Sequence, residues 1–342
     1  METKVIRITE ENIAEAASQA AELLNDGQLV AIPTETVYGL AAAIGWDEAL
    51  MQIFAVKGRP QDNPVIVHVS SLDMLRVVAS EVPQQALALA EAFWPGPLPM
   101  ILPKSELVSP VITCGMDTVA VRFPAHPVAR AVIEAAGVPI AAPSANLSGK
   151  PSPTTALHCE QDLDGKVPLI LDGGACDVGV ESTVITLAAE VPTILRPGII
   201  SLEQIREVLP DAVISEAVGR AVSDEEQVES PGMKYKHYSP DCDVIIVKGT
   251  LDQFAQYTAS RAEQDTYCMC FDGEETALSL PCVPYGSKAD ARSQAHNLFA
   301  ALRHLDYIGA KRVFVRAPEE EGEALAVANR LIRAAGFQVV QL

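Results

Sequence analysis

Residues 31–69 read AIPTETVYGLAAAIGWDEALMQIFAVKGRPQDNPVIVHV, and this segment combines two apolar runs with an unusual set of polar side chains. The apolar runs at residues 29–32 and 65–69 predict buried strands, and residues 47–56 between them predict a helix. Two threonines and a glutamate follow the first strand, a Lys-Gly-Arg-Pro loop follows the helix, and His68 lies inside the second strand. The segment therefore predicts an α/β fold that gathers hydroxyls, cations and a histidine around core strands.

Length, composition and charge limit the possible classes of protein. A chain of 342 residues predicts about two domains, and a hydrophobic content of 49% is enough for packed cores. The net charge of −20 argues against a large, non-specific contact with nucleic acid, because phosphate contacts need clustered Lys and Arg. No apolar run reaches the roughly 18 residues of a membrane span. We therefore expect a soluble, cytoplasmic protein with weak or no direct nucleic-acid binding and no membrane association.

The seven cysteines are odd in number and lack paired Cys-x-x-Cys spacing. Structural zinc sites usually show such pairs, and disulfide frameworks are typical of small secreted chains. The pattern therefore predicts reduced thiols and no dedicated protein metal site.

The chain is predicted to contain two α/β domains joined by a linker. Residues 1–215 mix strands and helices, and several links are too short for a crossover helix, so we expect a twisted, at least partly antiparallel sheet. Residues 216–241 show little apolar periodicity and carry an acidic run followed by lysines and tyrosines, which is typical of a linker. Residues 242–342 predict a smaller doubly wound, Rossmann-like α/β domain. Its predicted elements are strands at 243–248, 266–271, 312–316 and 337–341, and helices near 251–263, 288–307 and 321–335.

Four cations of the first domain are candidates for binding: Lys57, Arg59, Arg122 and Arg196. Each alone is more simply a surface charge, but all lie near the hydroxyl-rich turns PTET, PSANLSGKPSPTT and ESTV. Arginine forms bidentate contacts with phosphate or carboxylate, and lysine supplies a point charge. The nucleotide-binding patterns GxxxxGK[ST] and GxGxxG do not occur in the chain. The cations therefore predict a site for a polyanion and a small polar molecule on a different scaffold.

The first domain and the linker contain a series of longer motifs. They are PTETVYGL (33–40), KGRPQDNPVIVHV (57–69), WPGPLP (94–99), DTVAVRFPAHP (117–127), APSANLSGKPSPT (142–154), DGG (172–174), ESTV (181–184), LRPG (195–198) and SPGMKYKHYSP (230–240). With these motifs, the chain resembles the threonylcarbamoyl-AMP synthases, the YrdC-like family, in the long form with an additional carboxy-terminal domain. The last domain matches only in layout. The implied fold is a YrdC-like twisted mixed sheet with helices, followed by the small Rossmann-like domain.

The resemblance implies a reaction and its participants. L-Threonine, bicarbonate and ATP would give L-threonylcarbamoyladenylate and pyrophosphate, which is the work of a nucleotidyltransferase. Mg²⁺ would accompany ATP on its phosphates. The product would pass transiently to the tRNA threonylcarbamoyl transferase machinery, which modifies an adenosine beside the anticodon in certain tRNAs.

The resemblance also implies roles for individual residues. The catalytic signature corresponds to Lys57, Arg59, Ser144 and Asn146. L-Threonine and its carbamate would be held by Thr36, His68, Arg122 and Ser182. ATP would be held by Lys57, Arg59, Asn63, Thr118, the backbone at Ala142, Ser144, Ser152, Arg196 and Tyr238. Tyr238 and the basic linker would close over the nucleotide as a lid.

Two alternative functions remain open from the sequence. One is a related enzyme of the same fold that adenylates carbamoyl phosphate, although the acylphosphatase or zinc-finger segments usual in such enzymes are not visible in this chain. The other is an RNA-binding protein of the same fold without adenylation activity. The net charge of −20 weighs against the RNA-binding alternative.

Overall fold

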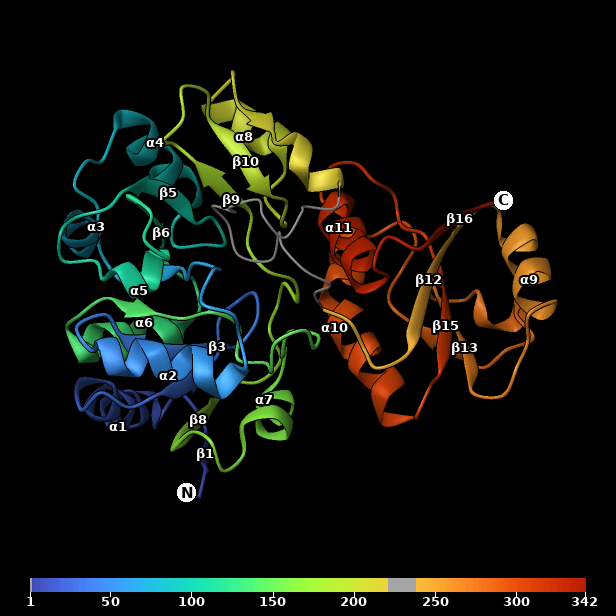
Figure 1. The fold of residues 1–342 in the computed structure, drawn as a ribbon, viewed down its shortest axis with the longest axis horizontal. Coiled ribbons are helices and arrows are strands. Elements are labelled where there is room, and N and C mark those ends of the chain that lie inside the picture. Colours follow the sequence, from blue (N-terminus) through green and yellow to red (C-terminus); the bar gives the residue numbers. More distant parts are fainter. Residues whose placement is uncertain (1, 221–237) are drawn as a thin grey trace.

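The computed structural model describes residues 2–220 and 238–342. These residues form two separate β-sheets, one of 11 strands and one of 5 strands, each covered by helices (Figure 1). The predicted fold class is therefore confirmed: the first sheet is mixed and the second is parallel. The domain limits expected near residues 215 and 241 stay a prediction, and most of the predicted linker lies outside the described residues. Within the described ranges, no helix is long and apolar enough to cross a membrane.

The first sheet has the strand order β1-β8-β2-β3-β7-β4-β6-β5-β9-β10-β11. Its central strand β4 pairs in parallel with β6 and antiparallel with β7, so the mixture predicted from the short links is present. The strands are β1 (Lys4–Arg7), β2 (Val30–Ile32), β3 (Gly39–Ala43), β4 (Val67–His68), β5 (Met100–Pro103), β6 (Thr118–Arg122), β7 (Ile140–Ala141), β8 (Leu169–Asp172), β9 (Val184–Thr186), β10 (Thr193–Arg196) and β11 (Val213–Ile214).

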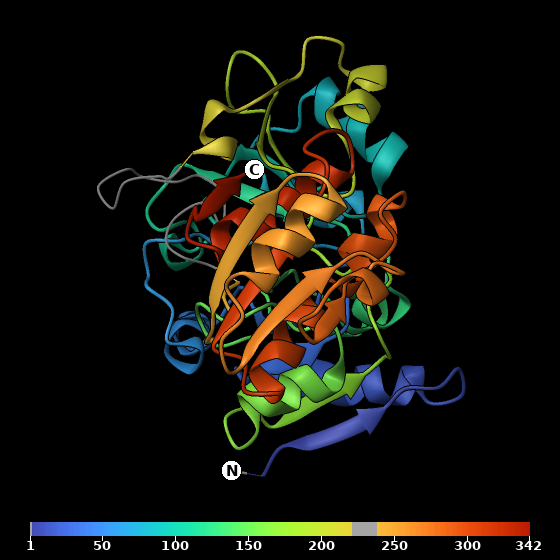
Figure 2. The ribbon, with the colours of Figure 1, turned by 90° about the vertical axis from the view of Figure 1, so that its right-hand side faces the viewer.

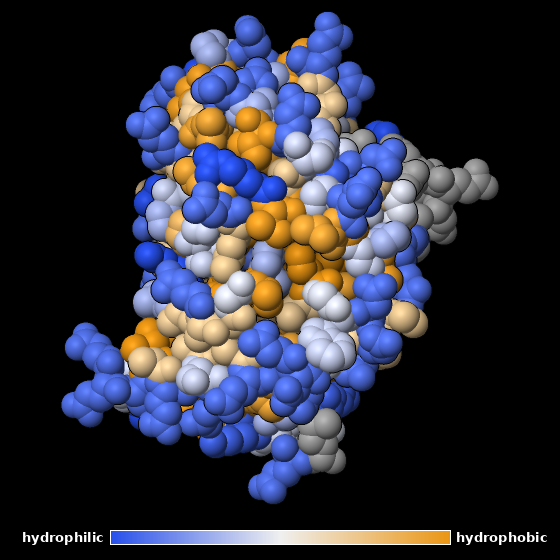
Figure 3. Space-filling model, turned by 90° about the vertical axis from the view of Figure 1, so that its left-hand side faces the viewer, coloured by the Kyte–Doolittle hydropathy of each residue, from blue (hydrophilic) through white to orange (hydrophobic). Residues whose placement is uncertain are grey.

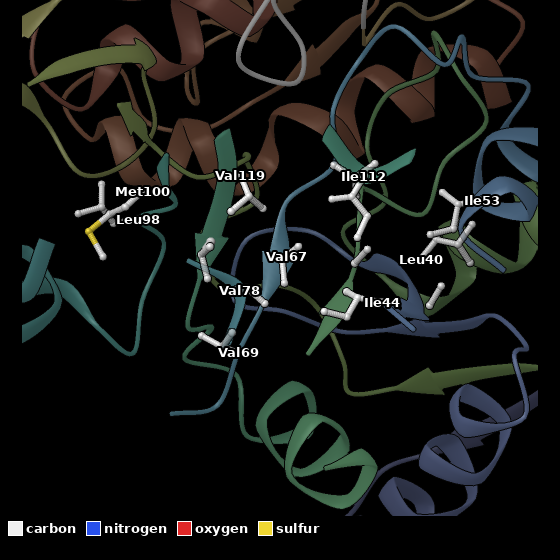
Figure 4. Close-up of a cluster of buried hydrophobic side chains, with 14 of the residues drawn as sticks. Leu40, Ile44, Ile53, Val67, Val69, Val78, Leu98, Met100, Ile112 and Val119 are labelled. Carbon is white, nitrogen blue, oxygen red and sulfur yellow. The ribbon is translucent and has the colours of Figure 1, made fainter. Parts of the chain in front are cut away.

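Helices cover both faces of this sheet (Figure 1). α1 and α6 pack on one face against side chains of β2 and β3. α2, α3, α4 and α7 enclose the larger aliphatic core on the other face, part of which is drawn in Figure 4. The helices of this half are α1 (Ile13–Asn25), α2 (Asp47–Lys57), α3 (Leu72–Val78), α4 (Gln84–Phe93), α5 (Pro110–Thr113), α6 (Pro127–Ala136), α7 (Ala156–Leu163), α8 (Leu202–Val208) and the 3-10 helix η1 (Glu216–Gly219).

The two cores follow from the side-chain period of two along the strands. In β6, Val119 and Val121 belong to the larger core, whereas Ala120 packs on the opposite side. In β3, Leu40 and Ala41 likewise contribute to opposite cores. The sequence did not predict β3, because glycine and alanine have little intrinsic preference for strands. Pairing with β2 and β7 and burial on both faces override that preference.

The second sheet is parallel and has the order β14-β13-β15-β12-β16. α9 packs on one face, toward the viewer in Figure 2, and α10 and α11 pack on the other, so this half is doubly wound as predicted. Its elements are β12 (Asp243–Lys248), α9 (Leu251–Ala259), β13 (Thr266–Cys270), η2 (Glu275–Ala277), β14 (Cys282–Pro284), α10 (Ala291–Tyr307), β15 (Arg312–Arg316), α11 (Ala324–Ala334) and β16 (Val339–Gln341).

Several predicted elements differ from the structure at their ends. The helix expected at 251–263 ends at Ala259, because the residues after it are exposed and have no apolar side to pack. The helix expected near 288–307 begins at Ala291, because the Asp290 side chain accepts hydrogen bonds from the first free backbone N–H groups. The short strands β1, β11 and β14 were not predicted. Each has two to four residues, which is too short for a periodic signal.

The two halves of the molecule share one apolar cluster. Val37 and Val180 of the first half pack in the same buried cluster as Phe299 of α10. Gly179 permits this approach, since its φ is +80° and a Cβ added there would lie 2.5 Å from the Ala295 carbonyl oxygen. Position 179 therefore has no room for a side chain where it contacts α10.

The face turned away from the second sheet is mainly hydrophilic around an apolar band (Figure 3). Exposed large apolar side chains in the described residues include Met51, Leu72 and Leu107. Such side chains are ordinary on the surfaces of folded proteins. The extended apolar surfaces of both sheets lie instead under their helices.

Gly179→Ala is expected to lower the free energy of unfolding by about 2–4 kcal/mol, because the positive φ is unfavourable for alanine and the new Cβ meets the α10 backbone. Gly174→Ala is the matched control, since its φ is +87° and an added Cβ would have no neighbour within 4 Å. The control should lose only about 1 kcal/mol. Denaturant unfolding followed by circular dichroism measures both values. Equal losses would show that the close contact with α10 does not matter for stability.

Candidate active site

One pocket collects most of the predicted site residues. Nine of the fourteen line it, namely Thr36, Arg59, His68, Arg122, Ala142, Ser144, Ser182, Arg196 and Tyr238. The lining also includes four residues to which the sequence analysis gave no role: Val37, Ile66, Pro143 and Glu181. Residues far apart in the chain therefore meet in one place, as expected for a binding site.

Arg122 and His68 lie side by side because their strands are in register. β4 pairs in parallel with β6, and His68 is the direct partner of Arg122 at the strand ends. The Arg122 guanidinium donates to the Thr36 hydroxyl over 3.0 Å and to the Gly96 carbonyl over 3.3 Å. It also lies 2.7 Å from a carboxylate oxygen of Glu35. Three of the four residues predicted to bind an amino acid therefore form one contiguous group.

His68 is held in its neutral form. Burial, followed by the positive charge of Arg122, lowers the pKa of His68 to about 3. Its Nδ1 atom is buried and has no hydrogen-bond partner within the described residues. A neutral imidazole beside a guanidinium can exchange a hydrogen bond with a ligand without adding a second positive charge.

Glu35 is a buried carboxylate whose role the sequence did not reveal. Burial alone would raise the pKa of Glu35, but Arg122 and backbone hydrogen bonds together outweigh it, so the pKa lies below its ordinary value. Glu35 itself is not part of the pocket lining, so its ion pair orients Arg122 from the side of the guanidinium that faces away from the pocket. The glutamate of PTET was visible in the sequence, but nothing there indicated a partner 87 positions away.

Arg59 enters the pocket because α2 ends just before it. Gly58 adopts a left-handed φ of 61° at the helix end, and the Arg59 N–H bonds to the Phe54 carbonyl over 2.9 Å. The Arg59 guanidinium donates to the carbonyls of Asn63 and Pro64 over 3.0 and 2.9 Å. Its Nε atom is buried without a partner in the described part of the chain. Burial lowers the pKa of Arg59 to about 10, which still leaves it charged at neutral pH.

Lys57 and Asn146 lie just outside the pocket lining and join two of its loops. Lys57 Nζ donates to the carbonyls of Ser144 and Asn146, the latter over 2.6 Å, and burial lowers the pKa of Lys57 well below its ordinary value. The Asn146 amide in turn donates to the carbonyls of Leu147 and Lys150 over 2.8 and 2.9 Å. In this structure, the two residues hold the shape of the Ser144 loop. Their direct contact with a substrate stays a prediction.

Arg196 and Ser182 form a third side of the pocket. The pairing of β10 with β9 shifts register between Ile194 and Arg196, and such an irregularity redirects the side chain that follows it. Arg196 Nε donates to the Ser182 carbonyl over 3.0 Å, and burial lowers the pKa of Arg196 to about 10. Gly198 packs against this segment so closely that a Cβ would lie 2.2 Å from the Thr183 nitrogen. The backbone that presents Ser182 is therefore fixed from two directions.

Besides Lys57, three further predicted ATP-binding residues do not line the pocket. Asn63 is buried beside the Arg59 loop, and its Oδ1 atom has no hydrogen-bond partner among the residues described. Ser152 is fully buried, and its hydroxyl donates to a carboxylate oxygen of Glu181. Thr118 begins β6, at the opposite end from Arg122, and lines a separate small hollow. The roles predicted for these three residues remain untested.

Tyr238 is the first residue described after the gap and lines the pocket from the second half. It has a positive φ of 65°, and its ring packs against Phe299 with centroids 5.3 Å apart. The guanidinium of Arg330 lies 5.7 Å from the ring centroid. The remaining basic and aromatic residues of the predicted lid, Lys234, Tyr235, Lys236 and His237, lie outside the described residues.

Comparisons with known proteins agree with this geometry. The Sua5/YciO/YrdC family model, described as "Telomere recombination", matches residues 22–198, and a model described as "Threonylcarbamoyl-AMP synthase, C-terminal domain" matches residues 200–336. A protein of Pyrococcus abyssi named threonylcarbamoyl-AMP synthase is 45% identical over 94% of this chain and 95% of its own length. A Bacillus subtilis protein of the same name is 42% identical over 95% of this chain and 94% of its own length.

A crystal structure described as P. abyssi Sua5 complexed with L-threonine superimposes with a TM-score of 0.92 at 42% identity. The alignment covers 99% of this chain and 100% of that one. The fold and the pocket thus define an α/β enzyme of the Sua5/YciO/YrdC class with an additional carboxy-terminal domain. The chain belongs to the threonylcarbamoyl-AMP synthase family.

Acid should destabilise the protein partly through His68. Its folded-state pKa of about 3 lies below the ordinary 6.5, so the unfolded chain binds this proton more readily, and stability falls as pH drops from 6.5 toward 3. His68→Gln removes this proton uptake. Between pH 6.5 and 4.5, it should reduce the slope of the free energy of unfolding against pH by up to about 1.4 kcal/mol per unit. Urea unfolding at a series of pH values gives both slopes, and parallel curves would refute a buried neutral His68.

Proposed function

We propose that this chain condenses L-threonine, bicarbonate and ATP into L-threonylcarbamoyladenylate and pyrophosphate. The observation that carries the proposal is the composition of this pocket. It combines a hydroxyl, imidazole and guanidinium group at Thr36, His68 and Arg122 with two further buried arginines, Arg59 and Arg196. The first set suits a small amino acid, and the second suits the phosphates of a nucleotide. The names of the full-length relatives and the threonine complex of the P. abyssi protein support the same reaction.

Arg122 is the proposed partner of the threonine carboxylate. Its guanidinium is already oriented by Glu35 and Thr36, so binding would need little rearrangement. The hydroxyls of Thr36 and Ser182 and the neutral ring of His68 are available to orient the amine and the side-chain hydroxyl of threonine. This arrangement would keep the amine beside the bicarbonate carbon, with which it forms a carbamate and water.

The carbamate oxygen then attacks the α-phosphorus of ATP, and pyrophosphate leaves with the electrons of the broken P–O bond. Such a displacement depends on alignment and on charge stabilisation, so the protein need not supply a covalent nucleophile. Arg59 and Arg196 are the proposed contacts for the phosphates, and Lys57 supports the Ser144 loop beside them. A positive charge fixed in a buried pocket stabilises the reaction most when it lies where negative charge develops in the transition state.

Mg²⁺ is proposed to enter with ATP. Phosphate oxygens are ligands that Mg²⁺ prefers, and it commonly keeps part of its water shell when bound to nucleotides. Within residues 2–220 and 238–342, no three His, Cys, Asp or Glu side chains gather as a metal site. The metal would neutralise part of the triphosphate charge, while the arginines hold the phosphates in place.

The wider setting is also part of the proposal. Transfer of the threonylcarbamoyl group to tRNA would follow by a transient hand-off to the modifying machinery, with the enzyme itself acting on small molecules in the cytoplasm. The net charge of −20 supports weak or no direct binding of the tRNA. The lid over the nucleotide stays a prediction, because its residues other than Tyr238 lie outside the described ranges.

Purified protein with ATP, L-threonine, bicarbonate and Mg²⁺ should release pyrophosphate and form the adenylate. Valine in place of threonine should be slower by at least about 100-fold, because the hydroxyls that read threonine would be left unpaired. Serine should be slower by only about tenfold, since it lacks one methyl contact. Pyrophosphate release and mass spectrometry of the adenylate measure each case. Equal rates with threonine and valine would exclude a hydroxyl-reading pocket, and absence of any adenylate would exclude the proposed reaction.

Arg59→Ala should lower the rate of adenylate formation by about 10²–10³-fold, because a buried charge that meets the phosphates would be lost. Arg59→Lys is the matched control that keeps the charge but loses the fork of donors, and it should retain more activity. Circular dichroism and thermal melting check that both variants fold, since Arg59 also bonds to the carbonyls of Asn63 and Pro64. Normal turnover by a folded Arg59→Ala variant would make Arg59 a structural loop residue.

A further inference from the structure

A buried arginine of the second half reaches the wall of the pocket. Arg330 lies on α11, and its side chain has 0% exposure. Its Nε atom donates to Glu181 Oε2 over 2.7 Å, and one terminal nitrogen donates to the Glu181 carbonyl over 3.0 Å. The other terminal nitrogen donates to Asn329 Oδ1 over 2.9 Å. All three guanidinium nitrogens are therefore engaged, and two of them hold the same residue of the first half.

Glu181 connects this arginine to the pocket. It is one of the lining residues, and its second carboxylate oxygen accepts a hydrogen bond from the hydroxyl of Ser152. Burial alone would raise the pKa of Glu181, but Arg330, Arg196 and the hydrogen bond from Ser152 together outweigh it, so the carboxyl stays ionised at neutral pH. The carboxylate is thus fixed between two parts of the molecule that are distant in sequence.

The backbone after Glu181 is held in the same way. The carbonyl of Glu181 accepts from Arg330, and the carbonyl of the next residue, Ser182, accepts from Arg196. Two consecutive carbonyls held by two guanidinium groups fix the peptide planes on both sides of the Ser182 Cα. These planes set the direction in which the Ser182 side chain enters the pocket.

We infer that Arg330 is a positioning residue for amino-acid binding, acting from the second domain through Glu181 on Ser182. The inference rests on the proposed function, because Ser182 belongs to the proposed threonine group. A purely stabilising role would not require this arrangement, since a buried ion pair can often be replaced by apolar side chains without loss of stability. The fork geometry and its two contacts with one residue are what a positioning role requires.

Arg330→Lys tests the inference while keeping the charge. Lysine provides a single ammonium group, so it cannot reach the carboxylate and the carbonyl of Glu181 with the same geometry. The dissociation constant for L-threonine, measured by calorimetry without ATP, should rise at least about tenfold, the equivalent of one charge-assisted hydrogen bond. In the adenylate assay, KM for threonine should rise with kcat changed less.

Arg316→Lys is the matched control. Arg316 is also a buried arginine of the second half, paired with Glu274 over 3.0 and 3.2 Å, but neither residue lines the pocket. The Arg316→Lys variant should lose as much stability as Arg330→Lys but keep wild-type threonine affinity. If both variants lose affinity equally, Arg330 acts only through the stability of its domain, and the inference is overturned.

A double-mutant cycle with Ser182→Ala shows whether Arg330 acts through that side chain. The effects of Arg330→Lys and Ser182→Ala on threonine affinity should be less than additive, because the second change removes what the first displaces. Full additivity would contradict the inference. If Arg330→Lys does not fold, the double variant Glu181→Gln/Arg330→Met removes both charges together. Wild-type threonine affinity in that double variant would also contradict the inference.

The wild-type measurements separate this inference from the proposed function. If wild-type protein neither binds threonine nor forms the adenylate, the proposed function fails. If wild-type protein does both and Arg330→Lys is unaltered, only the positioning role of Arg330 fails.

Discussion

The structure depends on the burial of several cations in and beside one pocket. An isolated charge in a protein interior costs several kcal/mol or more, so each cation must be surrounded by acceptors. Backbone carbonyls supply many of them: Arg59 bonds to two, Lys57 to two and Arg196 to that of Ser182. A loop whose carbonyl faces a buried cation cannot move without leaving that cation unsatisfied. The rigidity of the site therefore follows from the same charges that suit it to bind anions.

The distribution of charge reconciles a strongly acidic chain with an anion site. Among the described residues, three arginines line the pocket, and the one lining carboxylate, Glu181, is already paired with Arg330. The local balance is thus positive, although the whole chain has a net charge of −20. A cationic pocket with low-dielectric walls concentrates a small anion locally, whereas a long nucleic acid would meet the acidic remainder. The function and the composition are therefore compatible.

Sequence reasoning could predict those features that depend on neighbours along the chain. The apolar runs at residues 29–32 and 65–69 predicted β2 and β4, and nine of the residues named by family resemblance line one pocket. Sequence reasoning could not predict β3, which forms only because two other strands enclose it. It also could not pair Glu181 with Arg330, because 149 positions separate them and either residue alone resembles a surface charge. Contacts of that kind are decided by packing between distant elements and leave no local pattern.

The second domain belongs to the electrostatic framework of the site. Besides Glu35, residues of the first half place two more carboxylates in the interior, Glu181 beside the pocket and Asp162 on α7. Asp162 accepts a hydrogen bond from the backbone N–H of Leu147 and forms a 2.7 Å ion pair with Arg303 of α10. Glu181 forms its ion pair with Arg330 of α11. Each of the two helices thus supplies the guanidinium that hydrogen-bonds to one carboxylate. Since a buried carboxylate without a cation is strongly disfavoured, the loops of the first sheet reach their present positions only with α10 and α11 packed against them.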